Sequence, residues 1–188
     1  MSRIIVVDNG GQWTHREWRV LKEMGVETEI IKNNTPVNSI KADGIVLSGG
    51  TANFSYDERM LGSVSEYLDQ LSIPILGICV GHQFMSIHLG GEVKRAIKPE
   101  FGKVIIELKS DSELFKNIPK KFVAWASHND EVTSLPPSFI LTASSDNCLV
   151  EAMEDGSKSL YGVQFHPEVE HTEYGRKIFS NFVDICKK

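Results

Sequence analysis

The sequence predicts a single α/β domain whose sheet is largely parallel in its first part and mostly antiparallel in its second. Short β-rich runs alternate with segments of helical period in the first half, strands then follow one another without helices from residue 92 to residue 164, and an amphipathic helix ends the chain. A length of 188 residues suits one hydrophobic core, and no repeat or linker interrupts it. We therefore expect one domain over residues 1–188.

The first half is expected to alternate buried strands with helices. The strands are short apolar runs at Arg3–Val7, Thr28–Lys32, Gly44–Ser48 and Pro74–Ile78. The helices have a period close to 3.6 residues, and we place them at Thr14–Met24, Asp57–Gln70 and His82–Leu89. Gly25 ends the first helix, since glycine readily adopts the left-handed conformation found there.

The second half is expected to extend the sheet. Its strands are placed at Glu92–Lys94, Lys103–Leu108, Phe122–Ala126, Ile140–Ser144, Leu149–Met153 and Leu160–Gln164. A final amphipathic helix is predicted over Tyr174–Cys186.

Charge and composition exclude several classes of protein. A formal charge of −5, a pI near 5.7 and the lack of a basic stripe argue against nucleic acid as a partner. No apolar segment approaches the roughly 20 residues that a membrane helix requires. The three cysteines follow no disulfide pattern, and the sequence starts with a strand in place of a signal peptide. We expect a reduced, cytoplasmic protein.

A nucleophile elbow is predicted at Cys79. An apolar strand ends at this residue, Gly77 and Gly81 flank it, and a helix follows. A strand-to-helix turn this tight needs small neighbours and lifts the central side chain above the sheet. The helix N-terminus also favours the thiolate over the thiol. A lone core cysteine is the plainer interpretation, but the flanking glycines favour the elbow.

A base for this nucleophile is predicted far downstream. The strand that ends at Gln164 leads into His166, Pro167 and Glu168. In an extended segment, His166 and Glu168 project to the same side because one residue separates them. A cysteine, a histidine and an acid in this order suit a triad that the fold assembles.

These two motifs resemble the signature pair of the class I, triad-type glutamine amidotransferases. Within that family, three further segments resemble the glutaminase subunits of archaeal-type, two-subunit GMP synthetases: residues 8–12 (DNGGQ), 127–132 (SHNDEV) and 168–175 (EVEHTEYG). The resemblance covers essentially the whole chain. It implies a three-layer, flavodoxin-like fold with a central mixed, largely parallel sheet.

The resemblance also implies roles in glutamine hydrolysis. Cys79 would attack the side-chain carboxamide and form a thioester, His166 would transfer protons, and Glu168 would orient His166. The backbone N–H groups of Gly50 and Val80 are the candidates for the oxyanion hole. Side chains expected to bind the amino-acid end of glutamine are Gln83, one helical turn after Cys79, together with Ser127, Asn129 and Asp130.

The ammonia produced would need a separate synthetase. The resemblance implies an ATP pyrophosphatase subunit that adenylates XMP and makes GMP, and that carries the ATP and Mg²⁺, since this chain has no phosphate-binding loop. The segments His128–Asp130 and His171–Glu173 are candidates for docking it. Loops carrying Gly50, residues 127–130 and residues 166–172 are expected to move, which would make the isolated chain slow and activate it on docking.

Three other interpretations remain open. In the first, the chain uses the same triad to supply ammonia for anthranilate, aminodeoxychorismate or carbamoyl-phosphate synthesis. In the second, it acts alone as a γ-glutamyl or peptide hydrolase. In the third, it is a non-catalytic binding or regulatory module. A metal site is not predicted, because Pro167 separates His166 from His171, and His82 and His88 face different ways on one helix.

Overall fold

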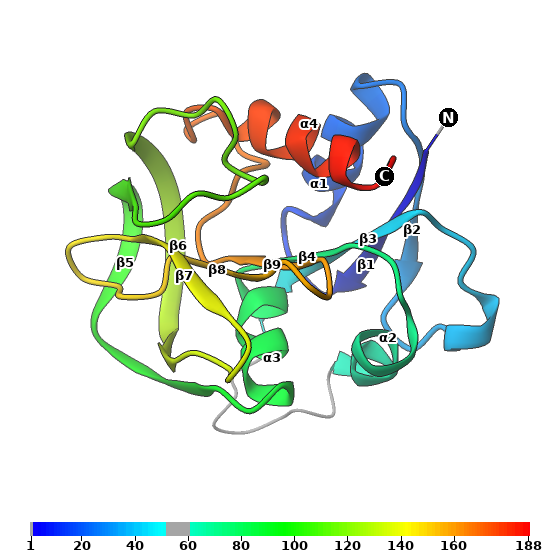
Figure 1. Ribbon diagram of the computed structural model, residues 1–188, viewed down its shortest axis with the longest axis horizontal. Coiled ribbons are helices and arrows are strands. Elements are labelled where there is room, and N and C mark those ends of the chain that lie inside the picture. Colours follow the sequence, from blue (N-terminus) through cyan, green and yellow to red (C-terminus); the bar gives the residue numbers. More distant parts are fainter. Residues whose placement is uncertain (1, 52–60) are drawn as a thin grey trace.

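The fold is built on one mixed sheet, seen in a computed structural model that describes residues 2–51 and 61–188. The strands lie in the order β2-β1-β3-β4-β9-β8-β7-β5-β6 (Figure 1). The first five strands in this order run parallel and the rest antiparallel. This arrangement confirms the predicted mixed α/β architecture.

The parallel part of the sheet positions the elbow. It contains β1 (Arg3–Asn9), β2 (Glu27–Lys32), β3 (Gly44–Gly50), β4 (Ile75–Ile78) and β9 (Leu160–Val163). β3 and β4 are buried along almost their whole length, as expected for strands covered on both faces. Because β4 pairs in parallel with β9, the segments that follow these two strands leave the same edge of the sheet.

Helices cover both faces of the sheet, which gives the three expected layers. In Figure 1, α1 (Thr14–Glu23) and α4 (Gly175–Ile185) lie on one face, while α2 (Val64–Gln70) and α3 (Val80–His88) lie on the other. Each face has its own apolar core. Phe179 of α4 packs in the first core and Tyr67 of α2 in the second, and both are fully buried.

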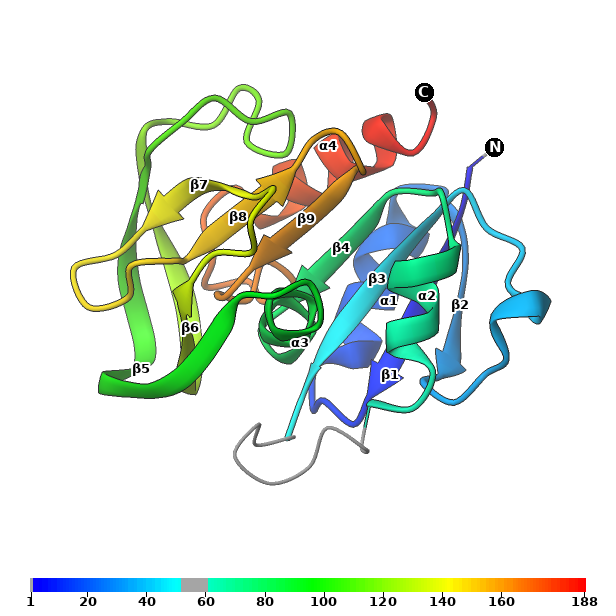
Figure 2. The same cartoon turned by 60° about the horizontal axis from the view of Figure 1, so that its bottom comes forward.

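The antiparallel part is dominated by one long hairpin. β5 (Glu92–Leu108) pairs with β6 (Lys121–Ser134), and β7 (Ile140–Ser144) and β8 (Ala152–Asp155) connect it to β9 (Figure 2). The sequence predicted two short strands where β5 is continuous, because Pro99 and Gly102 interrupt the β-rich pattern. A register shift between Arg95 and Glu100 places Pro99 in a bulge, and Gly102 pairs in register with Ala126, so the strand is not broken.

Other boundaries also differ from prediction. β8 begins three residues later than the expected Leu149–Met153, and β6 runs well past Ala126, so residues 127–130 belong to a strand and not to a loop. The predicted helix Asp57–Gln70 is confirmed from Val64, while residues 57–60 lie outside the described part of the chain. A short 3-10 turn, η1 (Val37–Ser39), was not predicted. Among the described residues, no helix is both long and apolar enough to cross a membrane.

Candidate active site

Cys79 occupies a strained elbow between β4 and α3. Its backbone has φ 50° and ψ −104°, in a region that side-chain-bearing residues rarely adopt. The glycine requirement is steric: a Cβ on Gly81 would lie 2.4 Å from the Leu47 carbonyl oxygen, and one on Gly77 would lie 2.7 Å from the Gly81 carbonyl carbon. The predicted elbow is therefore present in the structure, and both glycines are needed for it.

His166 is held rigidly beside the elbow. Its backbone N–H donates to the Trp125 carbonyl at 2.9 Å, and its own carbonyl accepts from the Thr172 hydroxyl at 2.6 Å. The Trp13 ring contacts the imidazole edge-on, with the ring centroids 4.5 Å apart. These contacts leave the ring few ways to turn.

Glu168 completes the predicted constellation. His166 Nδ1 lies 2.7 Å from Glu168 Oε1, and both side chains are buried. Burial lowers the pKa of His166, but the charge of Glu168 and the hydrogen bonds to Cys79 and Glu168 outweigh burial and raise that pKa well above its usual value. The raised pKa favours the imidazolium over the neutral ring, and an imidazolium provides a proton for a leaving group.

A cavity of about 380 Å³ opens onto these groups. Its lining includes Cys79, His166, Glu168 and Ser127, whose carbonyl oxygen lies 3.9 Å from Cys79 Sγ. A volume of this size suits a small polar metabolite. The geometry therefore combines a nucleophile, an oriented acid–base group and a binding space in one place.

The two predicted oxyanion donors belong to residues at the ends of β3 and α3. Gly50 ends β3 and lines the cavity, and Val80 is the first residue of α3, directly after Cys79. A Cβ on the neighbouring Gly49 would lie 3.3 Å from His166 Cε1 and 3.7 Å from Cys79 Cβ. A side chain at this position would press on the His166 ring, so glycine suits the end of this strand. The oxyanion role stays a prediction.

The four predicted glutamine-binding side chains are placed very differently. Ser127 lines the cavity, whereas Asn129 is exposed on β6 and is not among the lining residues of the described chain. Gln83 is buried, and its amide nitrogen donates to the Asp130 carbonyl at 2.6 Å and to Gln164 Oε1 at 2.9 Å. Asp130 is also buried. Gln83 thus serves the protein scaffold in this structure, and substrate binding by these residues stays a prediction.

Sequence reasoning missed one wall of the cavity, formed by the turn after β1 and the start of α1. This wall contains Gly10, Gly11, Gln12, Trp13, Thr14 and Glu17. Burial and the nearby charge of Glu168 raise the pKa of Glu17 well above its usual value, although His166 and the Gly49 backbone oppose the shift. An acid at a buried position of an amphipathic helix was the one signal in the sequence that marked Glu17.

The predicted docking segments are partly wrong. His128 and Thr172 are buried, so neither side chain meets a partner; Asn129, His171 and Glu173 are exposed. The other two cysteines lie away from the cavity. Burial raises the pKa of Cys148 far above its usual value and that of Cys186 to about 12, which favours the thiol over the thiolate at both residues.

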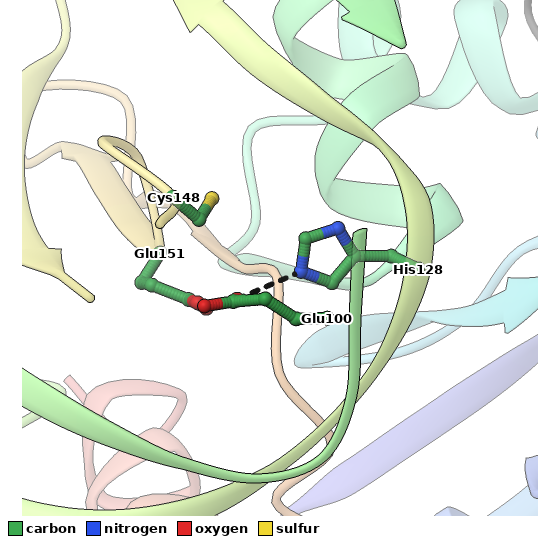
Figure 3. A group of neighbouring side chains, drawn as sticks. All are labelled: Glu100, His128, Cys148 and Glu151. Carbon is green, nitrogen blue, oxygen red and sulfur yellow. Dashed lines mark hydrogen bonds and ion pairs between the residues drawn. The ribbon is translucent and has the colours of Figure 1, made fainter. Parts of the chain in front are cut away.

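One buried cluster brings together groups that spacing along the chain did not reveal. Glu100, His128, Cys148 and Glu151 each offer a ligand-type atom, and these atoms lie within 4.8 Å of one another (Figure 3). Figure 3 shows His128 in contact with Glu100, at 3.1 Å between Nε2 and Oε2. Burial raises the pKa of Glu100, but hydrogen bonds from His128, Glu151 and Ser145 outweigh it and lower that pKa to about 2.

Burial, together with the Glu100 contact, raises the pKa of Glu151 well above its usual value. A raised pKa favours the protonated form of Glu151, and a protonated carboxyl is a hydrogen-bond donor. The donor set resembles that of a zinc site, but the Glu100 carboxylate already contacts His128 through one oxygen and accepts from the Ser145 hydroxyl through the other. We therefore interpret the cluster as a hydrogen-bonded network.

Comparison with known proteins agrees with this geometry. Residues 5–186 match the family model described as glutamine amidotransferase class-I. The glutamine-hydrolyzing GMP synthase subunit of Thermoplasma volcanium is 50% identical, with 100% of this chain and 94% of the relative covered. The corresponding protein of Thermococcus kodakarensis is 48% identical, with 97% of this chain and 98% of the relative covered.

Solved structures give the same assignment. A crystal structure of a GMP synthase subunit from Thermoplasma acidophilum has a TM-score of 0.95 and 49% identity, and covers 100% of this chain and 94% of that one. A glutamine amidotransferase from Thermotoga maritima shares the fold, with a TM-score of 0.77, 20% identity, and coverage of 99% of this chain and 82% of that one. With its elbow, its oriented histidine and its full-length match, the chain belongs to the class-I glutamine amidotransferase family.

Proposed function

We propose that this chain hydrolyses glutamine to glutamate and ammonia, and supplies the ammonia to a separate ATP-dependent synthetase subunit that converts XMP to GMP. The observation that carries the proposal is the juxtaposition of Cys79, His166 and Glu168 around one cavity. The full-length relatives are named as glutamine-hydrolyzing subunits of GMP synthase, which supports the choice of product and the existence of a second polypeptide.

Acylation uses the charged form of the Cys79–His166 pair. The thiolate of Cys79 attacks the side-chain carboxamide carbon of glutamine, and the N–H groups of Gly50 and Val80 face the oxyanion that forms. The His166 imidazolium gives its proton to the amide nitrogen as the carbon–nitrogen bond breaks. Ammonia leaves, and the γ-glutamyl group stays on sulfur as a thioester.

Deacylation reverses the proton transfer. Neutral His166 takes a proton from water, the hydroxide attacks the thioester, and the carbon–sulfur bond breaks to give glutamate and the thiolate. Glu168 keeps the imidazole in the tautomer and orientation that both steps require, because its carboxylate accepts only from a protonated Nδ1. One water is consumed per glutamine, and the site returns to its starting charge.

The finer details of the partnership are part of the same proposal. The partner is an ATP pyrophosphatase subunit that binds ATP and Mg²⁺, while this chain holds no cofactor or metal and works in the cytoplasm. Free ammonia would be lost to solvent, so the two subunits must contact each other near the cavity. Asn129, His171 and Glu173 are the predicted docking residues that the structure leaves exposed.

A reconstituted pair of subunits tests the proposal. Cys79→Ser should abolish GMP formation from glutamine and leave GMP formation from ammonium salts near the wild-type rate, because the amination site lies on the partner. Cys186→Ser is the matched control, since this thiol lies outside the cavity, and it should retain both activities. Loss of both activities in a folded Cys79→Ser complex would contradict the proposed division of labour. If the partner that binds this chain used chorismate and not XMP, the ammonia would serve anthranilate or aminodeoxychorismate synthesis, and GMP synthesis would be excluded.

A further inference from the structure

A buried chain of hydrogen bonds leads away from the catalytic sulfur through residues that do not line the cavity. Gln164 Nε2 lies 3.5 Å from Cys79 Sγ, and Gln164 Oε1 accepts from Gln83 Nε2 at 2.9 Å. Gln83 Nε2 also donates to the Asp130 carbonyl at 2.6 Å, and the same carbonyl contacts His128 Nδ1 at 3.0 Å. All these residues are at least nine-tenths buried.

The chemistry of the donors fixes the direction of this chain. The Asp130 carbonyl only accepts, so His128 Nδ1 and Gln83 Nε2 must both carry the hydrogens that point at it. The second hydrogen of Gln83 Nε2 then points at Gln164 Oε1, which leaves the Gln164 amide nitrogen as the group that faces sulfur. The Gln164 amide therefore cannot flip without losing its bond to Gln83.

The far end of the chain is anchored in the buried cluster of Figure 3. His128 Nε2 lies 3.1 Å from Glu100 Oε2, and Glu100 Oε1 accepts from the Ser145 hydroxyl at 2.7 Å. Near its other end, the Gln164 backbone N–H donates to the Glu151 carbonyl at 2.7 Å. Both ends are thus held by hydrogen bonds, and Glu100 and Glu151 are themselves buried.

We infer that Gln164 is a further catalytic residue, whose amide N–H stabilises the Cys79 thiolate, and that His128 is a positioning residue acting through Asp130 and Gln83. A thiolate accepts this hydrogen bond more strongly than a thiol does, since bonds to charged acceptors are about twice as strong. The sulfur would then lie between two donors, the His166 imidazolium and the Gln164 amide. The inference rests on the proposed function only in taking Cys79 as the nucleophile.

The direct test is the pH profile of Cys79 alkylation by iodoacetamide, with the modified peptide identified by mass spectrometry. Gln164→Met keeps the length of the side chain and removes the donor. We expect it to move the profile upward by about one pH unit, so that alkylation slows roughly tenfold on the acid limb, where the rate follows the thiolate fraction. Gln70→Met, at the exposed end of α2, is the matched control and should leave the profile unchanged.

His128 gives an independent test with a built-in rescue. His128→Leu removes the donor to the Asp130 carbonyl and should slow alkylation severalfold, less than Gln164→Met does, because it acts through intermediate groups. His128→Asn places an amide N–H where Nδ1 was, and should restore most of the wild-type profile. A merely structural role would lower thermal stability in both His128 variants without separating their alkylation profiles.

Other titratable groups near the sulfur are His166, Glu168, Glu17 and Glu151, and none of them is changed in these variants. A wild-type alkylation profile in folded Gln164→Met or His128→Leu would overturn the inference. So would stoichiometric zinc in the purified chain that is lost in His128→Leu, because the metal would then replace the proton between His128 and Glu100. Neither result depends on glutaminase activity, so failure of the proposed function would be seen separately, in the Cys79→Ser assay.

Discussion

Replacing Glu168 by glutamine probes the part of the site that does no chemistry of its own. The Glu168 carboxylate lies 2.7 Å from His166 Nδ1, and both groups are buried, so solvent cannot take over this bond. A hydrogen bond to a charged group contributes about 1.5–3 kcal/mol, which corresponds to a rate loss of roughly 10- to 150-fold. We expect Glu168→Gln to lower kcat within this range, while His166→Ala, which removes the acid and base outright, lowers it further.

The pH profile should change in a defined direction. The charge of Glu168 raises the pKa of His166 against the effect of burial, so the variant loses the imidazolium at a lower pH than the wild type. The alkaline limb of kcat should therefore move toward lower pH. The assay is glutamate release from glutamine at a series of pH values by the chain bound to its partner. Glu170→Gln, an exposed carboxylate two residues along, is the matched control. Wild-type kcat and an unmoved alkaline limb in Glu168→Gln would remove Glu168 from the triad.

Three further predictions concern the elbow, a buried acid and the partner. Gly81→Ala places a Cβ 2.4 Å from the Leu47 carbonyl oxygen and should lower the glutaminase rate roughly a hundredfold, because it displaces Cys79. Gly156→Ala, whose added Cβ meets nothing within 4 Å, is the control and should leave the rate unchanged. A fully active Gly81→Ala enzyme would disprove the steric requirement. Burial raises the pKa of Glu151, so its contribution to stability is present at acidic pH and lost as pH rises. Glu151→Gln should therefore unfold at a higher temperature than the wild type at pH 8, by about 2–4 °C for each kcal/mol of unfolding free energy gained, and this difference should close near pH 4. A melting temperature below that of the wild type at pH 8 would contradict this. Finally, the isolated chain should hydrolyse glutamine slowly and accelerate when the partner, ATP and XMP are added, whereas equal rates would exclude activation by the partner.

The elements of the parallel sheet could be predicted because their signals are local. An apolar run such as β4, flanked by Gly77 and Gly81 and followed by a helix, has few alternatives to a strand and an elbow. The hairpin of β5 and β6 was harder. Pro99 and Gly102 look like breaks along the chain, but against a continuous partner strand Pro99 falls within a bulge and Gly102 pairs in register with Ala126. Residues 127–130 were expected in a loop for the same reason, because their strand is stabilised by pairing across the hairpin and not by their own β propensity.

The site shows the same division between local and long-range information. His166 and Glu168 lie two residues apart, so their pairing could be predicted from the sequence, and the structure places them within hydrogen-bond distance. Gln164 reaches Cys79, and Glu100 meets His128, only because strands distant in sequence lie side by side. No spacing rule predicts such contacts. The same holds for Glu17, which the packing of α1 brings to the cavity.

The most direct test of the account is covalent labelling of the chain with a chloroketone analogue of glutamine, followed by peptide mapping and activity measurements on the complex. The account predicts one label per chain on the peptide that contains Cys79, protection by glutamine, and loss of GMP formation from glutamine with retention of GMP formation from ammonium salts. Loss of glutamine-dependent activity with the label on Cys148, Cys186 or any other residue, and Cys79 unmodified, would contradict it.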